Sequence, residues 1–339
     1  MGNRGGNAGG RRSIQRLKGN AELRLLVCLH SEGPVPSVLG LLDLSCPGAG
    51  PAPATCVHVL HLVDLAGRAS SSLVAHRNKK GFINPSEMAR LHNAFISYEQ
   101  DNRGRVSVQP YTSVAPFKTI HQDICSLAAE KAVLLVVVPF RRVTGTMGAD
   151  DLALRTNISQ ILAQAPCSVG ILVYPDDMAP ATPLVGGNYC PQIGVLFWGG
   201  PDDREALAYA SRMALHGRVS LTVVHFVRPV DQRDAKQRQL DDSLLSKVRF
   251  ENNNNEYVVV DEVLVRDMEQ TIAVIRSLGN SYNLVIVGRK QGPNSLLDEG
   301  LADWSECPEL GVVGDMLASK DFESSNSILV VQQRPRKGV

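Results

Sequence analysis

Three glycines near the C-terminus are placed where the backbone could cradle an anion. Gly288 ends a strongly apolar run, Gly292 follows it, and Gly314 stands at the expected start of the last helix, with Asp315 beside it. Glycine has no side chain to keep a ligand away from the backbone N–H groups, and the N-terminus of a helix attracts negative charge. The segment 300–319, GLADWSECPELGVVGDMLAS, therefore lies where an α/β unit often holds a phosphate.

The same region carries acidic side chains that would compete with a phosphate. They are Asp298, Glu299, Asp303, Glu306 and Glu309. The dipole of the following helix favours negative charge near its N-terminus, so an internal carboxylate would occupy the place of the phosphate and repel a second anion. We therefore expect no cofactor, with a nucleotide as the disfavoured alternative, and a structural or docking role for the loop.

Trp304 is the expected anchor of that docking role, with Glu306 and Glu309 beside it. A tryptophan in a loop is usually either a plug in the core or a hot spot in an interface. His30, at the end of an early apolar run, is a candidate for pH sensing, because histidine titrates near neutrality. We do not expect most of the other histidines to sense pH.

No residue pattern typical of an enzyme or a metal site is present. The sequence has no G-x-S-x-G, no G-x-x-x-x-G-K-[ST], no H-E-x-x-H and no C-x-x-C pair. Its seven cysteines are odd in number and scattered, which is typical of buried thiols in a reducing compartment. We expect no catalytic residue and no metal ion.

Composition bounds the class of protein. The chain has 339 residues, of which 44% are hydrophobic and 20% charged, enough for two domains with ordinary cores. The net charge of +1 gives no argument for a nucleic-acid partner, and we expect none. No apolar run reaches the length of about 18 residues that indicates a membrane span. Residues 1–20 are Gly-rich and basic, and we expect them to be a flexible segment.

An internal repeat predicts the elements that must position these residues. Six elements recur in the same order, with His61 and His225 at matching places inside apolar strands, where we expect buried core histidines. The paired ranges are 23–30 and 192–199, 35–45 and 202–215, 55–63 and 220–227, 106–131 and 258–281, 132–139 and 282–288, and 158–174 and 312–332. The strands are continuously apolar and alternate with helices, which indicates a parallel sheet buried on both faces.

We therefore predict an α/β fold of two tandem, doubly wound parallel-sheet domains of Rossmann type. The predicted parts are a domain over 21–178, a linker over 179–190, a domain over 191–334 and a tail over 335–339. The polar stretches 67–105 and 228–256 differ most between the copies, and we interpret their asparagine-rich and lysine-rich parts as loops.

The helix over 202–215 has the clearest start and stop signals. Asp202 is expected to cap it, Glu205 to complete a capping box three residues later, and Gly217 to end it.

Several segments resemble known families. The order of a strand, the helix GGPDDREALAYASRM and a strand ending in HF resembles the universal stress protein fold, a small doubly wound domain that binds adenine nucleotides. More specifically, seven segments resemble the cytosolic C-terminal region of the plant cation/proton exchangers, the CHX family. They are RRSIQR, AELRLLVCLH, VLHLVDLAGRASSSLVAH, NAFISYEQ, APCSVGILV, FWGGPDDREALAYASRM and GLADWSECPELGVVGDMLAS.

The resemblance to universal stress proteins implies a test for nucleotide binding. Their ATP-binding members carry G-x2-G-x9-G-[ST] after the fourth strand. In the first copy Pro139, which has no N–H to donate, stands in place of the first glycine, and Asn157 stands in place of the third. Arg141 and Arg142 could still attract an anion there.

The second copy comes closer to that signature. Gly288, Gly292 and Gly314 match its three glycines, but the spacing between them is longer and Asp315 replaces the final serine or threonine. The resemblance therefore implies a degenerate nucleotide loop.

The resemblance to the CHX family implies a function. Its members exchange potassium or other monovalent cations for protons through an N-terminal membrane domain, which would be the partner of this chain. The chain would be a regulatory region on the cytosolic face of an endomembrane or the plasma membrane. It would modulate transport in potassium and pH homeostasis and would not be an enzyme.

We also expect a homodimer. Two other functions are alternatives to the regulatory region of an antiporter: a free-standing tandem nucleotide-binding module and a dimerisation module. In the latter, edge strands such as VGILV (169–173) or SILVV (327–331) would pair between copies.

Overall fold

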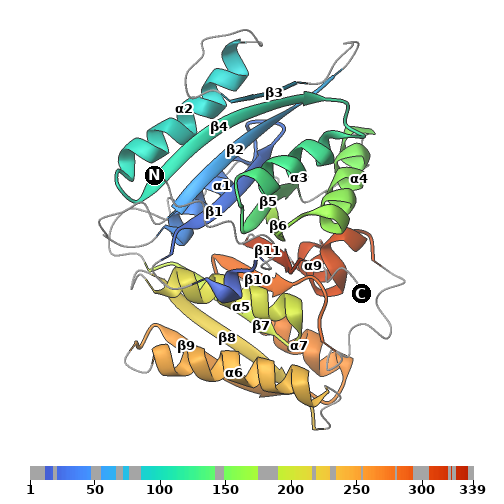
Figure 1. Cartoon of the computed structure of the whole chain (residues 1–339). Coiled ribbons are helices and arrows are strands. Elements are labelled where there is room, and N and C mark those ends of the chain that lie inside the picture. The colour runs from blue at the N-terminus through green and yellow to red at the C-terminus, as the bar shows by residue number, and fades with distance from the viewer. Residues whose placement is uncertain are drawn as a thin grey trace.

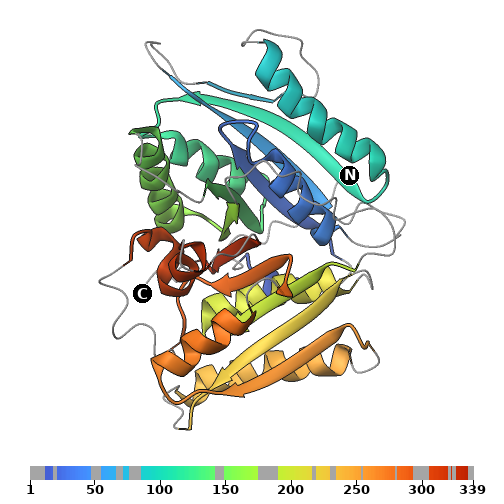
Figure 2. The same ribbon diagram turned by 180° about the vertical axis from the view of Figure 1, so that it is seen from behind.

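The structure is a computed structural model, and the residues that it describes form one continuous sheet with helices on both faces (Figure 1; Figure 2). The described residues are 12–17, 21–46, 55–65, 72–75, 85–141, 149–174, 190–215, 219–229, 234–252, 255–278, 281–292, 305–319, 322 and 326–334. The sheet has 11 strands in the order β3-β4-β2-β1-β5-β6-β11-β10-β7-β8-β9.

The first half of the sheet is built from the first copy of the repeat. Its strands are β1 (Leu23–Leu29), β2 (Thr55–Asp64), β3 (Ser72–Ala75), β4 (Val106–Ala115), β5 (Leu135–Arg141) and β6 (Ser168–Tyr174). Its helices are α1 (Val35–Ser45), α2 (Pro85–Asp101), α3 (Ile120–Glu130) and α4 (Ala149–Gln164). All its strand pairs are parallel except β3 with β4.

The second half repeats this arrangement. Its strands are β7 (Gln192–Phe197), β8 (Ser220–Val227), β9 (Val258–Leu264), β10 (Leu284–Gly288) and β11 (Ser327–Gln332). Its helices are α5 (Pro201–Ala214), α6 (Ala235–Glu251), α7 (Met268–Leu278) and α9 (Gly311–Ala318), the last preceded by the 3-10 turn η4 (Pro308–Leu310). Its strand pairs are all parallel.

The register confirms the repeat. Leu29 lies opposite His61 in the first half, and Phe197 lies opposite His225 in the second. Without β3, each half has the strand order 3-2-1-4-5 in its own numbering, which is the doubly wound order. The predicted α/β class with parallel sheets in tandem is therefore confirmed.

The two halves are joined edge to edge. Strand β6 pairs antiparallel with β11, so that Ile171 lies opposite Val330. The expectation that VGILV and SILVV are free edges is therefore wrong, because each strand satisfies the backbone donors and acceptors of the other. Any pairing between two copies of the chain would have to use a different surface.

Helices cover the two faces in the same way in both halves. Helices α1, α2, α5 and α6 pack on one face, where alternate strand residues such as Leu25 and Val27 are buried. Helices α3, α4, α7 and α9 pack on the other face against Leu26 and Cys28. The continuously apolar strands follow directly from this two-sided burial.

Two helices lie in the polar stretches that we predicted to be variable and loop-rich. Helix α2 buries a narrow apolar stripe of Leu91, Phe95 and Tyr98, and α6 buries Leu245 and Val248. In each case most of the helix is polar, so the helical period is carried by only a few residues.

The N-terminal segment also differs from the expectation. Residues 12–17, the part of the predicted flexible segment that the structure describes, lie against α5 and include the turn η1 (Ile14–Arg16) (Figure 1). Ile14 is 4% exposed and belongs to the core on the α5 face. The described part of the segment therefore packs on α5, a contact that its composition did not indicate.

Candidate functional site

The carboxyl ends of β7 and β10 meet where the predicted phosphate loop begins, and helix α5 starts there. In a doubly wound sheet this edge is where ligands bind. Gly288, the last residue of β10, packs against the first turn of α5. A Cβ atom on Gly288 would overlap the carboxylate of Asp203 and lie 2.6 Å from the Asp203 backbone nitrogen. The glycine therefore allows a close approach of helix and strand.

The other two glycines of the pattern also have close neighbours. The Gly292 N–H donates to the Gly199 carbonyl oxygen at 2.9 Å, and a Cβ atom on Gly292 would lie 2.8 Å from that oxygen. Gly314 lies inside α9, which starts three residues earlier than predicted, and a Cβ atom on it would lie 2.7 Å from Val330 Cγ2. Gly288 and Gly292 are thus brought to one site, whereas Gly314 packs on β11.

Asp203 takes the position at the N-terminus of α5 that an anionic ligand would take. Its Oδ2 accepts hydrogen bonds from the backbone N–H groups of Trp198 (2.7 Å) and Gly199 (3.0 Å). The next N–H, of Gly200, donates to Asp241 Oδ1 at 3.1 Å. Burial raises the pKa of Asp203 well above its ordinary value. Three successive backbone donors after β7 are therefore bound by side chains of the protein itself.

Asp202 binds backbone N–H groups that follow two further strands, β10 and β11. Its Oδ2 accepts from the Lys290 N–H after β10 (3.1 Å), and its Oδ1 accepts from the Gln333 N–H after β11 (2.9 Å). Burial raises the pKa of Asp202 to about 6. The prediction that Asp202 caps α5 is wrong, because the N-cap is Gly200, with φ of 101° and no side-chain hydrogen bond at the cap.

Glu205 holds the two halves together instead of closing a capping box. Its Oε1 accepts from the Ile14 N–H (2.7 Å) and from Ser168 Oγ of β6 (2.8 Å). Its Oε2 accepts from Ser13 Oγ (2.7 Å) and Gln15 Nε2 (2.9 Å). Glu205 is fully buried. The local pattern of Asp202 and Glu205 predicted a helix cap, but the actual partners are distant in sequence and no local signal could have identified them.

Asp315 binds the described part of the loop before α9. Its carboxylate accepts from Ser305 Oγ (2.8 Å), the Glu306 N–H (2.9 Å) and the Cys307 N–H (3.0 Å). The residue that replaces the signature serine or threonine thus acts as an internal anion for these donors.

The predicted docking residues separate into different environments. Glu309 is buried and forms an ion pair with Arg155 of α4, in the first half, so it is not available as a surface docking residue. Arg155 also donates to the backbone carbonyl of Glu306, whose side chain is exposed. Trp304 lies outside the described residues. His30 is partly exposed at the end of β1.

Of the corresponding positions in the first half, the structure describes Pro139, Arg141 and Asn157. Pro139 lies within β5, and Arg141 is exposed at its end, while Arg142 lies outside the described residues. Asn157 was expected to precede the last helix, but it lies inside α4, where its side chain donates to the Ala153 carbonyl at 3.1 Å. The expectation for Asn157 is wrong because α4 begins at residue 149.

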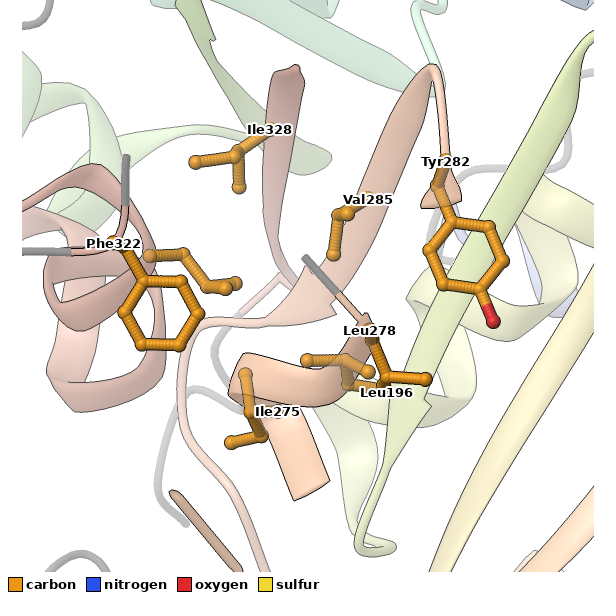
Figure 3. A pocket seen from close by; sticks show the side chains of 8 residues that line it. Leu196, Ile275, Leu278, Tyr282, Val285, Phe322 and Ile328 are labelled. Atoms are coloured by element: carbon orange, nitrogen blue, oxygen red, sulfur yellow. The ribbon is translucent and has the colours of Figure 1, made fainter. Parts of the chain in front are cut away.

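A small apolar pocket lies on the other face of the second half (Figure 3). Its lining includes Ile275 and Leu278 of α7, Leu317 of α9 and Phe322. Its cavity volume is about 10 Å³, which has room for at most one water molecule. The pocket lies between the sheet and helices α7 and α9, and a cavity of this volume gives no support for a ligand site.

Two negative findings concern the described residues alone. Within them, no helix combines the length and apolarity needed to cross a membrane. Across the same ranges, no three histidine, cysteine or acidic side chains lie close enough together to hold a metal ion.

The fold and this site define a class of protein, a tandem of doubly wound α/β units. We call the backbone donors that follow β7, β10 and β11 the strand-end site, and the carboxylates of Asp202 and Asp203 of α5 bind most of them. Two family models match the chain. One, described as the C-terminal domain of the plant cation/H(+) antiporter, matches residues 191–332, and the other, a plant cation/H(+) antiporter domain, matches residues 57–176. The chain belongs to the plant cation/H(+) antiporter family.

Similar proteins of Arabidopsis thaliana agree with this assignment. Cation/H(+) antiporter 15 is 44% identical over 95% of this chain and 42% of its own length. Cation/H(+) antiporter 14 and cation/H(+) symporter 13 are each 37% identical over 93% of this chain, and over 39% and 38% of their own lengths. The chain thus spans about two fifths of the length of the curated relatives that it matches.

Among solved structures, a universal stress protein from Archaeoglobus fulgidus DSM 4304 is similar at 12% identity. The similarity covers 92% of this chain and 96% of that chain, with a TM-score of 0.48.

Proposed function

We propose that this chain is the cytosolic regulatory region of a plant monovalent cation/H(+) antiporter, with potassium as the expected cation. It would modulate the exchange carried out by an N-terminal membrane domain of the same protein, in potassium and pH homeostasis. The observation that carries the proposal is the match of two antiporter family models to both halves of the chain. It is supported by a fold in which one sheet and one buried helix, α5, connect both halves.

Regulation requires that a signal bind two conformations with different affinity. The α5 region is suited to transmit such a difference. Asp202 binds the ends of β10 and β11, while Glu205 binds the N-terminal segment and Ser168 of the first half. A shift of α5 would therefore alter contacts in both halves at once.

We further propose that the strand-end site binds no nucleotide and has a structural role. The support is that backbone N–H groups after β7, β10 and β11 already donate to Asp203, Asp241 and Asp202. A phosphate would have to displace these side chains from the backbone donors that they already bind. The competing proposal, a free-standing tandem nucleotide-binding module, requires that these carboxylates move away.

Transport measurements on the intact protein test the regulatory role. Cation/H(+) exchange is compared in vesicles for the intact protein and for the same protein without this chain, at several values of pH on the cytosolic side. We expect exchange to persist while its dependence on pH or cation concentration changes. Identical curves would contradict regulation, and complete loss of exchange in a correctly inserted protein would show that the chain is part of the transport machinery.

Homodimerisation is also proposed, but through a surface other than β6 or β11, since these strands pair with each other. Light scattering of the purified chain over a range of concentrations tests it. A mass of one chain at all concentrations would contradict a dimer formed by this region.

A further inference from the structure

The N-terminal segment Arg12–Leu17 is held by a small number of polar contacts. Arg12 Nη1 donates to the carbonyl oxygens of Ala128 (3.2 Å) and Ala129 (3.0 Å), at the C-terminal end of α3. Ser13, Ile14 and Gln15 all donate to the single carboxylate of Glu205. This segment therefore bridges the first half and α5 of the second half. Besides the Arg12 contacts and the buried Ile14 side chain, its polar attachment to α5 is through one buried carboxylate, that of Glu205.

The Ser13 hydroxyl is the group in this contact that a covalent modification could alter. It donates to Glu205 Oε2 at 2.7 Å, and Ser13 is 8% exposed. A phosphate ester at Ser13 would have no hydrogen to donate and would add a charge of about −2 beside a buried carboxylate. Two negative charges at such a short distance in a buried site repel each other strongly. The phosphorylated segment could therefore not keep its position beside Glu205.

The sequence before Ser13 suits recognition by a kinase that selects basic residues. Arg11 and Arg12 directly precede Ser13. A short segment held by few contacts opens locally more readily than the strands of a core, so the hydroxyl can become accessible without unfolding of the sheet.

We propose that Ser13 is a phosphorylation site and that its modification releases residues 12–17 from Glu205. The reaction is transfer of the γ-phosphoryl group of Mg-ATP by a serine/threonine kinase. A bond forms between the phosphorus and Ser13 Oγ, the bond to the β,γ-bridging oxygen breaks, ADP leaves, and the hydroxyl proton passes to the base of the kinase. The released segment cannot rebind Glu205 until a phosphatase removes the group.

The release itself does not depend on the proposed transport role. If a membrane domain precedes the chain, as proposed above, residues 12–17 would link that domain to the sheet. Release of these residues would then loosen the contact between the membrane domain and both halves of the chain. That consequence rests on the proposed function, whereas the experiment below does not.

Hydrogen exchange on the whole chain tests the proposal. Phosphoserine is incorporated at position 13 during synthesis, and the exchange rate of the Ile14 amide, which donates to Glu205, is measured. We expect exchange of residues 14–17 to become at least tenfold faster. A matched chain with phosphoserine at the exposed Ser277 of α7 should leave these amides unchanged. Equal protection with and without phosphate at Ser13 would overturn the proposal.

The variant E205Q separates charge repulsion from steric effects. Its glutamine keeps the shape of Glu205 and removes the negative charge, so phosphoserine at position 13 should then accelerate exchange by a smaller factor, relative to unmodified E205Q. The same factor in both backgrounds would contradict release by charge repulsion.

A kinase reaction tests accessibility. A purified kinase that prefers arginine two residues before the serine, with Mg-ATP, should modify Ser13 in the folded chain, more slowly than in a peptide of residues 8–18. S13A should take up no phosphate at this site. Modification of the peptide but not of the folded chain would overturn the proposal, because the segment would then not open.

Discussion

Val330 of β11 lies opposite Ile171 of β6, in the antiparallel pair that joins the two half-sheets into one. Both residues are buried, at 1% and 0% exposure, so the junction is part of the core. The halves are also connected by the buried hydrogen bond between Ser45 Oγ and Tyr209 Oη (2.6 Å). Because these contacts are interior, changes at the junction should affect the stability of the whole chain.

The variant Tyr209→Phe should lower the free energy of unfolding by about 1 kcal/mol, the net contribution of a typical hydrogen bond. The loss should not be larger, because Ser45 Oγ also donates to the Leu41 carbonyl and keeps that partner. Urea unfolding measures the change. Tyr257→Phe, at a side chain that is 51% exposed, is the control and should change stability by less than about 0.5 kcal/mol. Equal effects of both variants would argue against the contact between the halves.

The variant Gly288→Ala should destabilise the chain by about 1–3 kcal/mol, because its Cβ atom would overlap Asp203 at the start of α5. Gly33→Ala is the matched control, since the nearest atom to its Cβ would lie 4.0 Å away. Thermal unfolding of both variants gives the comparison. If Gly288→Ala unfolds like the unmodified chain, α5 does not pack against β10 as described.

The variant Arg155→Met should destabilise the chain by about 3 kcal/mol or more, because it leaves Glu309 charged and buried without its partner. Arg249→Met removes an ion pair with Glu262, whose side chain is 55% exposed, and should cost about 1 kcal/mol or less. Chemical denaturation at low and high salt measures both. Losses of similar size would show that the Arg155 pair is not a buried connection between the halves.

The titration of Asp202 should contribute to the pH dependence of stability. Its pKa in the folded chain is about 6, above the ordinary value of 3.8, so the folded state holds the proton more tightly than the unfolded state. The stabilisation is therefore fully present below about pH 4 and is lost as pH rises to about 6, by up to about 3 kcal/mol.

Asp202→Asn cannot titrate, so the decrease in unfolding free energy between about pH 4 and 6 should be smaller in this variant. Urea unfolding at several pH values measures the slope for both chains. Parallel curves for the two chains would show that Asp202 is not the titrating group.

The general plan of the fold follows from the sequence because it depends on local patterns. Continuous apolar strands such as 282–288 and the matching places of His61 and His225 are visible without a structure, and they predict the doubly wound order. Helices α2 and α6 were missed because few of their residues are apolar. The pairing of β6 with β11 was not predictable either, since an apolar strand does not reveal its neighbour.

The candidate site was predicted less well than the fold. The three glycines were predicted to form a degenerate nucleotide loop, and in the structure a Cβ atom on any of them would lie close to atoms of the protein itself. Asp202 and Glu205 were interpreted as local helix caps, yet their partners lie 37 to 192 residues away. Long-range hydrogen bonds leave no signal in a single sequence, which is why Asp202 and Glu205 were not recognised as central residues. Asp203 was missed for another reason: its partners Trp198 and Gly199 are near in sequence, but they precede the helix and follow no capping pattern.

Calorimetric titration of the chain with Mg-ATP, ADP and AMP tests the central claim most directly. With the backbone donors at the ends of β7, β10 and β11 bound by carboxylates of the protein, we predict no measurable heat of binding at micromolar concentrations, while a nucleotide-binding universal stress protein measured in parallel gives a clear signal. Saturable binding of one nucleotide per chain with a micromolar Kd would contradict the account.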